Sequence, residues 1–112
     1  MRFKLRFSTR AAAEMEAVLD YTLVHFGRTK FVEYTDLIRE AFDQISRNPY
    51  AASARSRPEL GAHVFSYHIG RRGRRARHLF LYRVSEGSEG RVHLLRFLHD
   101  SMEPTIQEWD EI

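Results

Sequence analysis

Three strand-like segments follow one another in the second half of the chain, at about residues 62–70, 76–84 and 90–98. The connections between them are short: Gly70 and Gly73 bracket the first, and residues 86–90 form the second. Glycine-containing connections of this length are typical of tight turns between antiparallel strands. The second half therefore predicts three antiparallel strands of one sheet, and the first half must supply the elements that cover it.

The first half predicts one short strand and a helical hairpin. Residues 2–7 alternate between basic and apolar side chains, which is typical of a strand with one buried face. Ser8 and Thr9 are candidate N-caps of a first helix, and Gly27 suits the position just past its end. The apolar stripe of this helix is Met15, Val18, Leu19, Thr22 and Phe26. A second helix is expected at about residues 29–47, with the stripe Phe31, Tyr34, Leu37, Ile38, Ala41, Phe42 and Ile45.

These elements give the order β-α-α-β-β-β. The fold class is α+β, with the N-terminal strand and the helical hairpin packed on one face of an antiparallel sheet. Residues 49–61 are expected to form a loop. With 112 residues, the chain has room for one domain and one core. We expect a single domain at residues 1–103 and an acidic tail at 104–112.

Side-chain alternation divides the last two strands between two faces. Phe80, Tyr82 and Val84 share one face of their strand, and the other face carries Leu79, Leu81 and Arg83. In the last strand, the pair Leu95 and Phe97 opposes the set Val92, Leu94, Arg96 and Leu98. We place the larger aromatics under the helices, which leaves an exposed second face of mixed apolar and arginine character. Such a face predicts a partner site, unless the tail packs there and completes an ordinary core.

Composition restricts the available chemistry. The chain has no cysteine, so disulfides and thiolate chemistry are excluded. No apolar run approaches the roughly 20 residues that span a bilayer, and we expect a cytoplasmic protein with no membrane partner. His63 and His68 would lie on opposite faces of a strand, so no metal site is predicted. No cofactor is expected either.

Charge is distributed unevenly along the chain. Residues 1–99 carry 18 basic and 10 acidic side chains, whereas residues 100–112 carry five acidic and no basic ones. Five arginines crowd into one predicted turn: Arg71, Arg72, Arg74, Arg75 and Arg77. They are expected either to form a merely solvated turn or to steer an acidic partner or a nucleic acid electrostatically. No recognition helix is evident, and the cluster lacks interleaved aromatics, so sequence-specific DNA binding is not expected.

Four segments together resemble the ParE toxins of the RelE/ParE toxin–antitoxin superfamily. They are FSTRAAAEMEAVLDYTLVHFG at 7–27, RPEL at 57–60, HLFLYRV at 78–84 and LLRFLHDSME at 94–103. The resemblance runs through roughly residues 3–103 and implies a helical hairpin on an antiparallel sheet. It also implies the toxin of a bacterial type II system that serves plasmid stabilisation. Such a toxin is neutralised in a hetero-oligomer with a cognate ParD-like antitoxin, and it inhibits DNA gyrase by binding, without enzymatic activity.

The surface predicted to bind antitoxin or target combines the exposed face with the end of the last strand. Its residues are Arg57, Leu79, Leu81, Arg83, Leu94, Arg96, Leu98, His99 and Met102. The alternative implied by the same superfamily is a ribosome-dependent mRNA endoribonuclease of the RelE type. Its candidate catalytic residues would be His99, Arg96, Arg83 and Arg57. Residues 100–104 carry two acids and no base, which disfavours a site that must approach a phosphate. A toxin that has lost activity but still binds an antitoxin is the third possibility.

Overall fold

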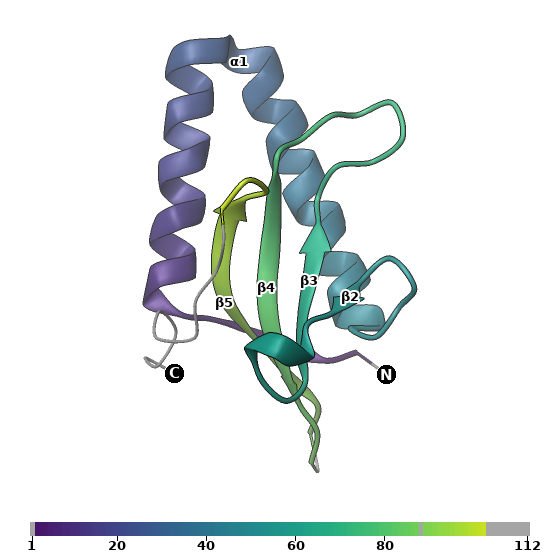
Figure 1. Cartoon of the computed structure of the whole chain (residues 1–112). Coiled ribbons are helices and arrows are strands. Elements are labelled where there is room, and N and C mark those ends of the chain that lie inside the picture. Colours follow the sequence, from purple (N-terminus) through teal and green to yellow (C-terminus); the bar gives the residue numbers. More distant parts are fainter. Residues whose placement is uncertain (1, 88, 103–112) are drawn as a thin grey trace.

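The computed structural model of the chain describes residues 2–87 and 89–102 (Figure 1). Its elements are β1 (Lys4–Phe7), α1 (Thr9–Arg47), β2 (Arg55–Ser56), the 3₁₀ turn η1 (Pro58–Leu60), β3 (Val64–His68), β4 (His78–Ser85) and β5 (Arg91–His99). The α+β prediction is confirmed. The predicted tail at 104–112 lies outside the described residues.

The helix α1 is broken at Gly27 into two arms, residues 9–26 and 28–47, that run antiparallel to each other (Figure 1). Gly27 has φ 86° and ψ 177°, a backbone conformation that is strongly disfavoured for every residue except glycine. Ser8 caps the first arm because its Oγ accepts a hydrogen bond from the Ala11 N–H at 2.9 Å. The predicted helical hairpin is therefore confirmed. Within the described ranges, no helix is both long and apolar enough to cross a membrane.

The five strands form one sheet in the order β1-β5-β4-β3-β2. The three predicted hairpin strands, β3, β4 and β5, pair antiparallel as expected. In contrast, β1 pairs parallel with β5, so the sheet is mixed rather than antiparallel throughout. The short strand β2 pairs antiparallel with β3 inside the segment 49–61, which was expected to be a loop.

The main core lies between the sheet and α1. The second arm contributes Tyr34, Leu37, Ile38, Ala41 and Ile45, all buried. From the sheet, Phe80, Tyr82 and Val84 meet them, as the alternation of β4 predicts. The rings of Phe42 and Phe80 lie 5.4 Å apart, and those of Phe80 and Phe97 lie 4.5 Å apart. Aromatic packing thus joins the second arm to the two central strands.

The predicted faces of β5 are wrong for half of the strand. Arg96 pairs with Leu81, but Leu94 pairs with Tyr82, so Leu95 is an extra residue in the ladder. A bulge of this kind shifts the alternation by one residue. As a result, Val92 and Leu94 join the helix-side core with Phe97, whereas the opposite face receives Leu95 and Leu98.

Candidate functional site

The face of the sheet turned away from α1, here called the open face, carries its own apolar cluster. Its buried members are Leu60, Val64, Leu81, Leu95 and Leu98. Leu60 comes from η1, which lies in front of the sheet in Figure 1. Leu79 is only partly buried and packs against the edge of this cluster. Leu81 is fully buried, so Leu79 is the more accessible of the two predicted β4 leucines.

A groove of about 380 Å³ opens beside this cluster and is here called the open-face groove. Four of the predicted binding residues line it, namely Arg57, Leu79, Leu98 and Met102. The other lining residues are Ser53, Arg55, Ser66, His68 and Asp100. Met102 is 52% exposed, a high value for an apolar side chain. The groove therefore combines accessible apolar contacts with two guanidinium groups, a combination common in protein–protein interfaces.

The local backbone positions Arg57, which lines this groove. Its N–H donates to the Val64 carbonyl oxygen at 2.8 Å, which continues the β2–β3 pairing by one residue. The Arg57 Nε donates to Glu59 Oε2 at 2.8 Å, and this hydrogen bond lowers the pKa of Glu59. Glu59 remains exposed. Arg57 therefore enters the groove with its guanidinium already oriented by one ion pair.

Asp100 also lines the open-face groove. Its carboxylate contacts His68 Nε2 at 3.0 Å and Arg77 Nη2 at 3.1 Å. The hydrogen bond from His68, followed by that from Arg77, lowers the pKa of Asp100. This carboxylate ties the end of β5 to the ends of β3 and β4. From the sequence, Asp100 was expected only to help repel a phosphate.

Arg96 does not lie on an exposed face, contrary to the sequence-based expectation. It is 2% exposed, and its Nε and Nη2 donate to the Glu14 carboxylate at 3.0 and 2.6 Å. Glu14 also accepts the Phe97 N–H at 3.0 Å. The cause is the short length of β1, which pairs with β5 only as far as Leu94. Beyond that point the first arm of α1 flanks β5. Glu14 accepts the hydrogen bond from the Phe97 N–H that a neighbouring strand would otherwise have accepted.

The candidate nuclease residues are not brought together in one pocket. Arg57 lines the open-face groove, whereas His99 lines a different groove on the helix side. Arg96 is engaged by Glu14, and Arg83 is half-buried beside Gly61. His99 Nδ1 lies 2.8 Å from Ser101 Oγ and accepts the Ser101 N–H at 3.1 Å. Through these contacts, His99 caps the turn that follows β5.

A second imidazole lies close to His99. The His78 and His99 rings are 5.3 Å apart, and His78 Nδ1 contacts the Tyr34 hydroxyl at 2.9 Å. Burial, followed by the charge of His99, lowers the pKa of His78 to about 4. His78 is therefore neutral at pH 7 and forms part of the wall between β4 and the second arm. Leu94, also a predicted contact residue, is buried on this side of the sheet.

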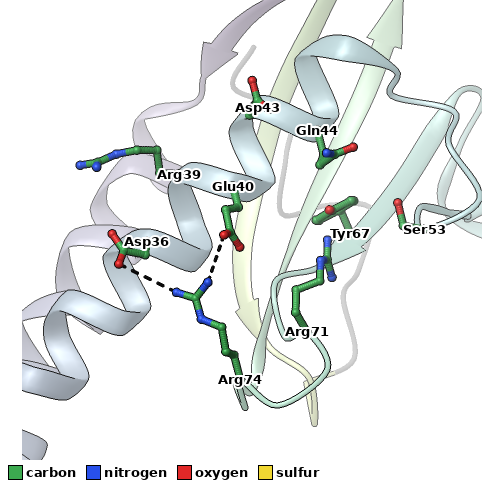
Figure 2. A pocket seen from close by; sticks show the side chains of 9 residues that line it. All are labelled: Asp36, Arg39, Glu40, Asp43, Gln44, Ser53, Tyr67, Arg71 and Arg74. Atoms are coloured by element: carbon green, nitrogen blue, oxygen red, sulfur yellow. Dashed lines mark hydrogen bonds and ion pairs between the residues drawn. The ribbon is translucent and has the colours of Figure 1, made fainter.

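The arginine cluster is divided by the structure into anchored and exposed members. Figure 2 shows Arg74 reaching α1, where it contacts Glu40 Oε1 at 3.0 Å and Asp36 Oδ2 at 3.9 Å. The Arg71 guanidinium lies 4.4 Å from the centre of the Tyr67 ring and donates to the His68 carbonyl oxygen. The remaining members, Arg72, Arg75 and Arg77, are exposed. Arg71 and Arg74 thus fasten the β3–β4 turn to the body of the protein.

Sequence reasoning missed several residues of this region. Glu14 and Asp100 both neutralise arginines, and His68 links Asp100 to β3. Glu14 is 82 positions away from Arg96 along the chain. No local pattern marks such a pair, because opposite charges this far apart in sequence meet only after the strand order is set.

Comparisons with known proteins agree with the fold. The chain resembles a chain from the chromosomal ParDE TA system of P. aeruginosa with a TM-score of 0.66 and 18% identity, covering 87% of this chain and 95% of that one. A YoeB/ParE toxin from Agrobacterium tumefaciens gives a TM-score of 0.58 and 18% identity, with coverages of 87% and 98%. No curated protein matches significantly. The family model described as the ParE toxin of the type II toxin–antitoxin system parDE matches residues 5–104, and the chain belongs to this family.

Proposed function

We propose that the free toxin inhibits DNA gyrase by binding and that it has no enzymatic activity of its own. A cognate ParD-like antitoxin neutralises it in the cytoplasm by occupying the open-face groove. The groove offers accessible apolar contacts at Leu79 and Met102, with the buried Leu98 beneath them, and Arg55 and Arg57 add positive charge. An antitoxin segment that carries apolar side chains and carboxylates would match this surface.

One observation carries the choice of binding over RNA cleavage: the cation that the nuclease alternative needs at Arg96 is buried and paired with Glu14. A group that stabilises a scissile phosphate must face the substrate with its charge available. Arg96 meets neither condition, and His99 faces a different groove from Arg57. The geometry therefore favours a toxin that acts through its surface.

The first experiment is induced expression in bacteria, with pulse labelling of DNA and protein synthesis. We expect DNA synthesis to fall first, with filamentation and DNA-damage induction, and purified toxin to inhibit supercoiling by gyrase. His99→Ala should leave this toxicity largely intact. An early stop in translation that His99→Ala abolishes would establish the nuclease instead. No growth effect would leave antitoxin binding as the remaining function.

A matched pair of variants tests the open-face groove. Met102→Glu places a carboxylate in the groove, whereas Val32→Glu changes a side chain of similar exposure, 49%, on the second arm. We expect Met102→Glu to weaken binding of the antitoxin encoded beside the toxin gene by about tenfold or more, since it removes an apolar contact and adds a negative charge that repels the antitoxin carboxylates. Val32→Glu should bind as the unmodified toxin does. Equal affinities for both variants would place the antitoxin on another surface.

A further inference from the structure

A second groove, of about 730 Å³, lies on the helix side of the sheet and is here called the tip groove. It is bounded by the two arms of α1 close to Gly27 and by the turn that leads into β4, elements that adjoin in Figure 1. Its walls carry five rings: Tyr21, Phe26, Tyr34, His78 and His99. Three cations, Lys30, Arg75 and Arg77, also line it, and none of the described residues that line it is a carboxylate. The tip groove therefore differs from the open-face groove, whose lining includes the carboxylate of Asp100.

Two of these rings are largely open to solvent. Tyr21 is 58% exposed and Phe26 is 64% exposed. The Tyr21 ring lies 4.2 Å from that of His25 and 6.1 Å from that of Phe26, so three rings adjoin on the first arm. Leu23 and Val24 are also exposed nearby, but they do not line the groove. The large exposed side chains that face the groove are therefore aromatic rather than aliphatic.

The cations beside these rings differ in their availability. Lys30 contacts Glu33 at 3.0 Å, and Arg77 contacts Asp100 at 3.1 Å. Arg72 and Arg75 are exposed, and neither has an ion-pair partner among residues 2–87 and 89–102. A shallow depression that adjoins the tip groove shares Arg75 and Arg77 with it and also contains Arg72. A continuous path thus leads from the exposed rings to unneutralised guanidinium groups.

The anchoring of the turn makes this path a fixed feature. Arg74 holds the β3–β4 turn against the second arm through Glu40 and Asp36, as Figure 2 shows. Arg71 packs on Tyr67 at the base of the same turn. Because these two arginines fix the backbone of the turn, Arg75 is held in the tip groove with Tyr21 and Phe26, and Arg72 is held in the adjoining depression. The sequence places these rings and the arginines about 50 positions apart, so only the fold reveals the combination.

We propose that the tip groove and the adjoining arginines form a binding site for single-stranded nucleic acid. Bases stack on Tyr21 and Phe26, and the phosphates contact Arg72 and Arg75, which is the recurring arrangement of sequence-tolerant single-strand binders. Duplex DNA would not bind in this way, because its bases are stacked on one another and cannot reach the rings. The site is separate from the open-face groove, so it adds a ligand to the antitoxin and gyrase proposed above.

Fluorescence anisotropy of the purified full-length chain tests this site. The probes are fluorescein-labelled single strands of about 15 nucleotides, oligo-dT and oligo-U, and a DNA duplex of the same length. We expect both single strands to bind more tightly than the duplex. A preference for oligo-U would identify RNA as the natural ligand, and a preference for oligo-dT would identify single-stranded DNA. Either preference supports the site.

Two sets of variants separate stacking from simple charge attraction. Tyr21→Ala and Phe26→Ala should each weaken single-strand binding by about tenfold, since each removes the ring on which one base stacks. Val24→Ala is the matched control because Val24 is 77% exposed on the same arm but does not line the groove. Replacing Arg72 and Arg75 together by Gln should reduce the slope of log K against log salt by about 1.4, because each neutralised phosphate of a single strand accounts for about 0.7. Arg47→Gln with Arg91→Gln, both on other surfaces, should reduce it less.

Three results would overturn the proposal. The first is no oligonucleotide binding at low salt. The second is binding that Tyr21→Ala and Phe26→Ala leave unchanged, since the attraction would then be purely electrostatic. The third is a polyglutamate peptide that binds as tightly as the oligonucleotides and competes with them, which would make the surface a docking site for an acidic protein segment. Circular dichroism of each variant shows whether it remains folded, and the exposure of Tyr21 and Phe26 makes that outcome expected.

Discussion

Replacing Glu14 by Ala is expected to destabilise the fold strongly, although Glu14 lies on a helix surface. The Arg96 side chain is 3% exposed, and the Glu14 side chain is 22% exposed. Glu14 accepts hydrogen bonds from Arg96 and from the Phe97 N–H, all at 3.1 Å or less. Removing one partner of a buried ion pair typically costs about 3–5 kcal/mol. Because water can partly reach the Glu14 position, we expect the lower end, about 3 kcal/mol.

Urea denaturation followed by circular dichroism measures this destabilisation. In thermal denaturation, a loss of about 3 kcal/mol from a domain of this size corresponds to a fall in Tm of about 12 °C. The matched control is Glu16→Ala, which removes an exposed carboxylate from the same turn of the first arm and should change stability by less than about 0.5 kcal/mol. Glu14→Leu combined with Arg96→Met should recover a substantial part of the stability, because no charge is then left buried. The Phe97 N–H would still lack its acceptor, so we do not expect full recovery.

A small effect of Glu14→Ala would refute this reasoning. If the variant is destabilised by less than about 1 kcal/mol, Arg96 must regain solvent or another partner when Glu14 is removed. Arg96 would then be able to leave Glu14 and contact a phosphate. Its burial and its pairing with Glu14 would no longer argue against the nuclease alternative. The stability measurement therefore also bears on the proposed function.

Two further predictions concern the ends of the elements. Gly27→Ala should lower stability by about 1–3 kcal/mol in urea denaturation, because a Cβ there meets no atom within 4 Å but is strained at φ 86°. Gly87→Ala, also free of neighbours but without a positive φ, should be almost neutral, and equal destabilisation of both variants would contradict the backbone explanation. Asp100→Asn should flatten the acid side of the pH–stability profile. The pKa of Asp100 is lowered in the folded state, so its contribution is present above the unfolded-state pKa and is lost as the pH falls through the folded-state pKa. Parallel profiles of the variant and the unmodified protein would refute the role of its contacts with His68 and Arg77.

Sequence patterns were sufficient where the structure depends on neighbours along the chain. The alternation at 3–7, the stripe from Tyr34 to Ile45 and the cap at Ser8 each have a local cause, and the structure contains all three features. The break at Gly27 is also local, since its backbone conformation favours glycine. These elements, with the short connections between β3, β4 and β5, fix the α+β order.

Tertiary structure decided what depends on pairing across the chain. The bulge at Leu95 moved Val92 and Leu94 to the helix side, because alternation predicts faces only while a strand stays regular. The short β1 left room for Glu14 to bury Arg96, and the folded turn brought Arg75 beside Tyr21 and Phe26. The sequence by itself therefore determined which elements form and which residues are apolar or charged. Only the fold decided which charges are neutralised and which grooves remain open, because ion pairs and grooves are made by residues that are distant in sequence.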